Sequence, residues 1–265
     1  MKQRVIYGAL CAVIAVVCIV LSVYSRVLFF VACSLIAAHE MKGAFSKLGH
    51  KIELWPMYAL CIGCSALLFF SKAGYVFPMF MMIMLLLFTQ MILTGRPAIR
   101  DVYATLGVMA YPLSPILLTV YISLKNDLCA AIFLNGILPA ILSDTFALFG
   151  GRKFGKHKLS PHISPKKTVE GLICGLAAGT LSGFAIHSLL TALSFSLIPL
   201  WAVVAAAFAS AVAGAFGDLA ASSVKREAGI KDYSNLIPGH GGILDRVDSA
   251  LFAIPTCYMI YALFI

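Results

Sequence analysis

Residues 75–94 read YVFPMFMMIMLLLFTQMILT and contain no Asp, Glu, Lys, Arg or His. The hydrocarbon core of a bilayer is about 30 Å thick and a helix rises about 1.5 Å per residue, so about 20 apolar residues cross it. The segment therefore predicts a transmembrane helix. Eight further apolar runs lie on either side of it, at residues 5–25, 27–39, 56–71, 102–124, 128–149, 169–190, 198–217 and 249–265.

The composition agrees with a membrane protein. Of the 265 residues, 61% are hydrophobic and only 12% are charged, about half the charged share of a soluble domain. This excludes a soluble enzyme, a disordered chain and a disulfide-stapled secreted module. We expect an all-α, polytopic integral membrane bundle of about nine transmembrane helices. Run 5–25 is predicted to be a retained span, and run 27–39 to continue as a helix into the polar segment that follows it.

The basic residues indicate an orientation. If the N-terminus is cytoplasmic and the nine spans alternate, 17 of the 20 Lys and Arg residues lie on the cytoplasmic side, as basic residues in membrane proteins generally do. We therefore expect an integral protein of the cell (inner) membrane with its active site on the cytoplasmic side. The net charge of +9 follows from this topology and also suits anionic phosphates. Nucleic acid is not an expected partner.

Two regions are predicted. Residues 1–130 would form N-terminal transmembrane helices that face lipid or a dimer partner, and residues 131–265 a catalytic region with cytoplasmic loops 150–168 and 217–248. Glycines recur at every fourth position from Gly171 to Gly183, a spacing that lets helix backbones approach closely. Such small-residue faces permit a homodimer but do not require one.

The segment 217–248 holds three aspartates at the edges of predicted spans. Asp218 ends one apolar run, and Asp245 and Asp248 open the next. Carboxylates at a membrane border are costly unless they are paired or bound to a cation. Mg²⁺ takes one or two carboxylates together with substrate phosphates, so the pattern indicates a metal and phosphate site. Taken singly, each residue also fits an ordinary polar loop, with Asp245 as a helix cap.

The same segment contains Pro238-Gly239-His240-Gly241-Gly242 directly before the last apolar run. Glycines allow backbone N–H groups to turn toward an anion at the start of a helix. Four basic residues surround this stretch: Lys225, Arg226, Lys231 and Arg246. Together these groups suit a triphosphate or pyrophosphate, although His240 alone is more often a structural histidine.

A second polar segment follows the sixth apolar run. Asp144 lies near the cytoplasmic end of that run, where a carboxylate indicates either a functional group or a packing residue satisfied by hydroxyls. Ser164-Pro165-Lys166-Lys167-Thr168 then offers hydroxyls and two cations beside a predicted helix start. This stretch fits two interpretations equally well: an anion-binding site, or basic residues that only set the orientation of the helices in the membrane.

These motifs resemble the phosphatidate cytidylyltransferases, also called CDP-diacylglycerol synthases. The chain fits every position of their C-terminal signature through Ser222, Lys225, Arg226, Lys231, Asp232, Ser234, Ile237, Pro238, His240, Gly241, Gly242, Asp245, Arg246 and Asp248. The run from Ser143-Asp144 to Gly171 also looks like the family, and Glu40 does so more weakly. The resemblance covers the C-terminal half, whereas the first 130 residues match only as apolar spans.

The resemblance implies a reaction in which phosphatidic acid and CTP give CDP-diacylglycerol and pyrophosphate with a divalent cation. Asp218 and Asp245 would hold Mg²⁺, with Asp144 and Asp248 as second choices and a second cation left open. The implied catalytic residues are Asp144, Asp218, Lys225, Arg226, Lys231, Asp245 and Asp248. The implied substrate-binding residues are Ser164, Lys166, Lys167, Thr168, Ser222, His240, Gly241, Gly242 and Arg246.

Two other functions fit part of the pattern. A CTP-dependent kinase of polyprenols or other lipids would use similar groups but transfer the γ-phosphate. A secondary transporter would have many spans and an intramembrane carboxylate such as Asp144. A transporter is less favoured because the charged residues gather at the cytoplasmic border rather than at the bilayer midplane.

Overall fold

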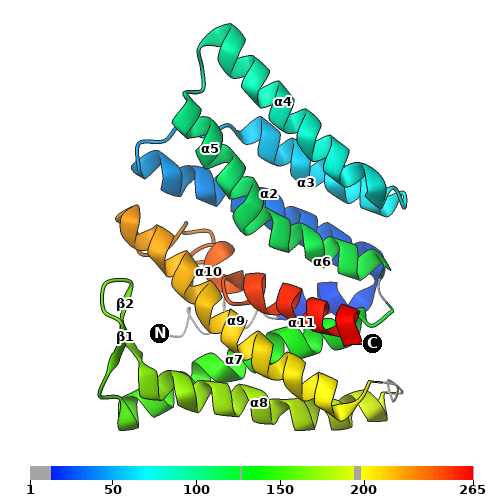
Figure 1. The fold of residues 1–265 in the computed structure, drawn as a ribbon, viewed down its shortest axis with the longest axis vertical. Helices are drawn as coiled ribbons and strands as arrows, with labels where there is room; N and C mark the ends of the chain where they lie inside the picture. Colours follow the sequence, from blue (N-terminus) through cyan, green and yellow to red (C-terminus); the bar gives the residue numbers. More distant parts are fainter. Residues whose placement is uncertain (1–12, 126, 194–197, 265) are drawn as a thin grey trace. The chain divides into compact units, whose positions relative to one another are not determined.

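The computed structural model describes residues 13–125, 127–193 and 198–264, and nearly all of its regular structure is helical. Figure 1 shows the elements. The helices are α2 (Val23–Lys47), α3 (Leu54–Phe69), α4 (Val76–Thr94), α5 (Ile99–Val108), α6 (Ser114–Lys125), α7 (Cys129–Phe154), α8 (Val169–Ala192), α9 (Leu200–Glu227), α10 (Leu244–Val247) and α11 (Ala250–Phe264). The expected all-α class is confirmed, apart from one hairpin of strands β1 (Lys158–Ser160) and β2 (Ser164–Thr168).

Among the described residues, six helical segments have the length and composition to cross a membrane: Val23–Lys47, Ala73–Thr94, Ile99–Leu124, Cys129–Phe154, Val169–Ala192 and Leu200–Glu227. Helices α3 and α11 are apolar but shorter. The expected polytopic membrane bundle is therefore confirmed. The first predicted span begins outside the described residues, so the count of nine and the N-terminal orientation stay predictions. Helix α2 runs unbroken to Lys47, as expected for the second apolar run.

The chain divides into two compact units, and neither is one continuous stretch. Unit 1 comprises Met1–Asn126 with Val224–Arg246, and unit 2 comprises Asp127–Ser223 with Val247–Ile265. The predicted roles of residues 1–130 and 131–265 remain predictions. Helix α9 continues ten residues beyond the end of its apolar run, to Glu227. It ends just before Gly229, whose φ of +66° suits glycine at a helix terminus.

In unit 1, α2 packs against α6 and α3, and α3 packs against α4. The buried side chains of α2 include Phe30, Ala37 and Met41. Helix α4 buries only Ile83 and Leu87, so most of its apolar surface is available to lipid. Between α5 and α6 the backbone leaves helical geometry at Tyr111 (φ −143°, ψ 122°), because the following proline lacks an N–H and restricts the residue before it.

In unit 2, the paired helices α7 and α8 form the main contact (Figure 1). The first part of the predicted glycine stripe lies in this contact: a Cβ atom on Gly175 would lie 2.5 Å from the Ser143 carbonyl oxygen, whereas one on Gly183 would meet Val204 of α9. Asn135 of α7 donates its amide to the Val203 carbonyl (3.0 Å) and to the Tyr261 hydroxyl (2.9 Å). Since Val203 is on α9 and Tyr261 on α11, this buried side chain connects three helices.

The antiparallel β1–β2 hairpin joins α7 to α8, with Lys158 opposite Thr168. Thr168 is also the N-cap of α8, because its Oγ1 accepts the Gly171 N–H at 3.2 Å. Such a cap satisfies a backbone donor that has no partner within the helix. The hairpin therefore fixes Lys166 and Lys167 beside the start of α8, in the segment predicted as a polar loop.

Candidate functional site

A pocket of about 610 Å³ lies within unit 2. Its lining comes from the C-terminal half of α7, the hairpin, the first turn of α8, the middle of α9 and the residues before α11. The charged lining residues are Asp144, Arg152, Lys158, Lys166, Lys167, Asp218 and Asp248. Three carboxylates and four cations thus converge on one cavity, which can receive a ligand that carries both phosphates and a metal ion.

The carboxylates of this pocket are held by specific partners. The Lys167 Nζ lies 2.6 Å from Asp218 Oδ2, and the Ser222 hydroxyl donates to Asp218 Oδ1 at 3.2 Å. Ser249 donates its hydroxyl to Asp144 Oδ2 at 3.1 Å and its N–H to Asp248 Oδ1 at 2.8 Å. One serine therefore orients two of the three carboxylates.

The donor set of the pocket fits a hard divalent cation. Among the described residues, no group of three or more His, Cys, Asp and Glu side chains is arranged to enclose a metal. Mg²⁺ does not need such a cage, because it uses one or two carboxylates and takes its other oxygens from water and substrate phosphates. Asp144 and Asp218 supply two carboxylates on the wall of one pocket.

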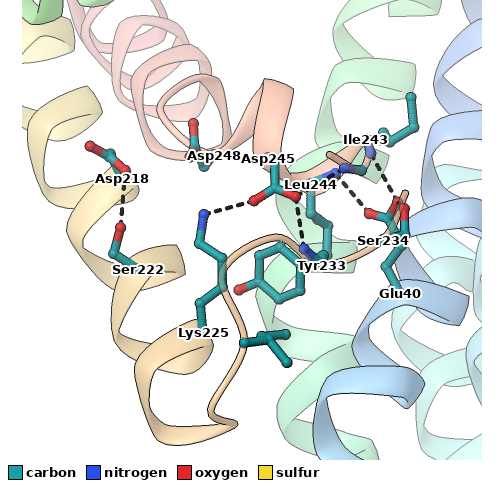
Figure 2. A network of polar contacts seen from close by, with 12 residues as sticks. Glu40, Asp218, Ser222, Lys225, Tyr233, Ser234, Ile243, Leu244, Asp245 and Asp248 are labelled. Atoms are coloured by element: carbon teal, nitrogen blue, oxygen red, sulfur yellow. Dashed lines mark hydrogen bonds and ion pairs between the residues drawn. The ribbon is translucent and has the colours of Figure 1, made fainter. Parts of the chain in front are cut away.

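Asp245 belongs to unit 1 and is nearly enclosed, with 2% of its side chain exposed. The Lys225 Nζ lies 2.7 Å from Asp245 Oδ1. Asp245 Oδ2 accepts the backbone N–H groups of Tyr233 (2.8 Å) and Gly242 (2.9 Å). Figure 2 shows this arrangement. Both oxygens therefore have partners, and a metal on Asp245 would require Lys225 to move.

Glu40 of α2 is a second buried carboxylate in unit 1, and only 4% of the residue is exposed. Its Oε1 accepts the Ser234 hydroxyl (2.7 Å) and the Ile243 N–H (2.9 Å), and its Oε2 accepts the Leu244 N–H (2.9 Å) (Figure 2). The sequence singled out Glu40 only through a weak resemblance. Its position directly after an apolar run was the one available signal.

The glycine-rich stretch is shaped by these two carboxylates. Gly241 has φ +81°, and a Cβ atom there would lie 2.7 Å from Asp245 Oδ2. A Cβ atom on Gly242 would overlap the Glu40 carboxylate. The Gly242 N–H, which was predicted to bind a phosphate, is donated to Asp245. The phosphate role of His240, Gly241 and Gly242 stays a prediction.

The structure gathers the predicted site residues into two groups. Unit 2 brings together Asp144, Lys166, Lys167, Thr168, Asp218 and Asp248 around the pocket, with Ser222 bonded to Asp218. Unit 1 brings together Lys225, Gly241, Gly242 and Asp245. The predicted residues Arg226, Lys231 and Arg246 are exposed, and Ser164 is half-buried outside the lining of the pocket. A Mg²⁺ ion shared by Asp218 and Asp245 stays a prediction.

Comparisons with known proteins find similarity to cytidylyltransferases. A sequence model described as the cytidylyltransferase family matches residues 2–264. A phosphatidate cytidylyltransferase of Thermotoga maritima is 34% identical over 145 residues, which are 54% of this chain and 54% of that protein. The Bacillus subtilis phosphatidate cytidylyltransferase is 41% identical over 122 residues, 46% of this chain and 44% of the relative.

A plant phosphatidate cytidylyltransferase is also similar to this chain. The chloroplastic phosphatidate cytidylyltransferase 4 of Arabidopsis thaliana is 48% identical over 118 residues, 44% of this chain and 29% of that protein. The chain thus matches about half or less of the length of these curated relatives.

Proposed function

This chain belongs to the cytidylyltransferase family, and we propose that it transfers CMP from CTP to phosphatidic acid, giving CDP-diacylglycerol and pyrophosphate. The family match over residues 2–264 and the relatives named as phosphatidate cytidylyltransferases support this reaction. The observation that carries the proposal is the unit 2 pocket, where three carboxylates and four cations line one cavity.

In the proposed reaction a phosphate oxygen of the lipid attacks the α-phosphorus of CTP, and the bond from this phosphorus to the bridging oxygen of the β-phosphate breaks. Negative charge builds up on the leaving pyrophosphate. Arg152, Lys166 and Lys167 line the pocket and would hold these phosphates in place. Positioning and electrostatic stabilisation carry most of the catalysis in phosphate transfers of this kind.

Mg²⁺ is the proposed cofactor, and Asp218 would hold it with Asp144 as the neighbouring carboxylate. Bound there, it would offset charge on the attacking and leaving oxygens. In this proposal Lys167, which pairs with Asp218 at 2.6 Å, exchanges that partner for a substrate phosphate. The participation of Asp245 in binding the same ion remains a prediction.

The lining of the pocket also suits an amphiphilic substrate. Leu148, Leu159 and Leu172 lie on the wall that bears the charged groups, so a phosphate head and the start of an acyl chain would both find suitable contacts. The hairpin lies in a segment predicted to be cytoplasmic, which supports a site on the cytoplasmic side of the inner membrane. A homodimer remains part of the proposal, but the glycine stripe of α8 would not form its interface, because the stripe packs against α7 and α9 within unit 2.

The experiment is to incubate the purified protein with phosphatidic acid, Mg²⁺ and CTP labelled at either the α- or the γ-phosphate. We expect the α-label in the lipid product and the γ-label in pyrophosphate. Transfer of the γ-label to lipid would replace the proposal with a lipid kinase. The absence of label from lipid in both samples would overturn an enzymatic role with this substrate.

A further inference from the structure

Glu40 and Asp245 both bind the loop of unit 1 between α9 and α10. Asp245 accepts N–H groups from Tyr233 and Gly242. Glu40 accepts donors from Ser234, Ile243 and Leu244. Each group bound by Glu40 comes from a residue that directly neighbours Tyr233, Gly242 or Asp245. The two carboxylates therefore hold residues 233 and 234, inside the loop, next to residues 242–244, where the loop meets α10.

Within the described part of the chain, hydrogen bonds and not a cation stabilise the Glu40 carboxylate. No ion pair among the described residues involves Glu40. A buried carboxylate without a cation is tolerated when it accepts several hydrogen bonds, and bonds to an ionised acceptor are stronger than neutral ones. Three donors at 2.7–2.9 Å meet this requirement.

The loop packs closely against the Glu40 carboxylate. The Gly242 backbone lies so close to Glu40 that a Cβ atom would overlap the carboxylate. The Ile243 and Leu244 N–H groups are at the start of α10, where helix donors lack partners within the helix. Glu40 supplies those partners from a helix about 200 residues away in the chain.

We propose that Glu40 is a positioning residue for the transfer reaction: it fixes the loop at residues 234, 243 and 244 and thereby holds Asp245 against Lys225. This inference rests on the proposed function and adds a residue that does not contact the substrate. Partners that orient a site residue change activity about 10–100-fold when they are substituted.

The test uses Glu40→Gln in the full chain, with Asp101→Asn as the matched control. Asp101 is also 4% exposed, and its Oδ1 accepts the Lys51 N–H at 3.1 Å and contacts His50 Nδ1 at 3.2 Å. It thus resembles Glu40 in burial but does not bind the loop. Glutamine keeps the size of Glu40, but its amide NH₂ replaces an acceptor and faces a backbone donor.

The measurements are steady-state kinetics with CTP and hydrogen–deuterium exchange of the loop amides. For Glu40→Gln we expect kcat to fall about 10–100-fold with little change in KM for CTP, because the cations of the unit 2 pocket are unchanged. We also expect faster exchange at Ile243 and Leu244. Asp101→Asn should keep kcat and the slow exchange of these two amides.

Either of two kinetic results would overturn the catalytic part of the inference. One is Glu40→Gln with unchanged kcat, and the other is an equal loss of kcat in Glu40→Gln and Asp101→Asn. If the unsubstituted protein forms no CDP-diacylglycerol, the proposed function fails, and with it the catalytic part of this inference. Unchanged amide exchange in Glu40→Gln would separately overturn the claim that Glu40 fixes the loop.

Discussion

Asp218 has a different partner on each carboxylate oxygen, Lys167 on one and Ser222 on the other. If this carboxylate binds the catalytic cation, Asp218→Asn removes the charge that attracts the ion while keeping the shape of the side chain. We expect CDP-diacylglycerol formation to fall on the order of 100-fold, measured as initial rates over a range of Mg²⁺ concentrations. Ser222→Ala is the comparison variant, because it removes one hydrogen bond to Asp218 but keeps the charge; its activity should fall less, by about 10-fold. Activity of Asp218→Asn within threefold of the unsubstituted protein would remove Asp218 from the metal site.

The Lys225–Asp245 pair makes a prediction about stability. Only 10% of the lysine and 2% of the aspartate side chain are exposed, so Asp245→Asn would leave a buried ammonium group unpaired. Removing one partner of such a pair costs about 3–5 kcal/mol of unfolding free energy. The double variant Asp245→Asn/Lys225→Met should be more stable than the single variant, because no unpaired charge remains. Thermal unfolding in detergent measures both, and equal unfolding temperatures would contradict the prediction.

At the residue level, the sequence indicated charged groups but not the partners that hold them, and the catalytic roles of these groups stay predictions. Asp144, Lys167 and Asp218 were predicted from their position at membrane borders and from motifs, and the structure brings them to one pocket. The sequence did not indicate that Glu40 accepts backbone N–H groups from residues 243 and 244. Almost every residue type has a backbone N–H group, so the identity of residues 243 and 244 does not show that they donate to Glu40. This contact could therefore not be predicted from one sequence.

At the scale of elements, the α7–α8 contact depends on the absence of side chains from the glycine stripe of α8. Gly175→Ala would add a methyl group 2.5 Å from the Ser143 carbonyl oxygen. We expect this overpacking to lower the unfolding free energy by about 1–3 kcal/mol. Gly43→Ala in α2 is the matched control, because nothing lies within 4 Å of its added methyl group. The control should be neutral or stabilising by up to about 1 kcal/mol. Equal thermal unfolding of the two variants would show that the α7–α8 contact tolerates a wider separation.

Hydrophobicity predicted which elements exist but not where each one ends. The run 198–217 marked the apolar part of α9, yet the helix continues to Glu227. A helix needs apolar side chains only where it is in lipid, so its backbone can stay helical after the apolar run ends. The hairpin at Lys158–Thr168 was expected to be a loop. Its strands of three and five residues are too short for an alternating pattern to be distinguished from a polar connection.

For the whole molecule, the predicted orientation can be tested with single cysteines introduced at exposed positions. His162, in the hairpin connection, is predicted to be cytoplasmic, and Lys72, between α3 and α4, is predicted to lie outside; both are exposed. In intact cells a membrane-impermeant maleimide should label Lys72→Cys but not His162→Cys, and permeabilised cells should show labelling of both. The unsubstituted protein gives the background. The reverse pattern would invert the predicted topology and move the pocket to the outer side.

Because unit 1 is assembled from Met1–Asn126 and Val224–Arg246, its contacts cannot all form until the second of these segments has been synthesised. Residue 244 emerges about 200 residues after Glu40, so α2 enters the bilayer long before its carboxylate can meet the Ile243 and Leu244 donors. During that interval the Glu40 carboxylate lacks the backbone N–H partners that it has in the folded protein. The last contacts of α2 within unit 1 therefore depend on a segment that is synthesised near the end of the chain.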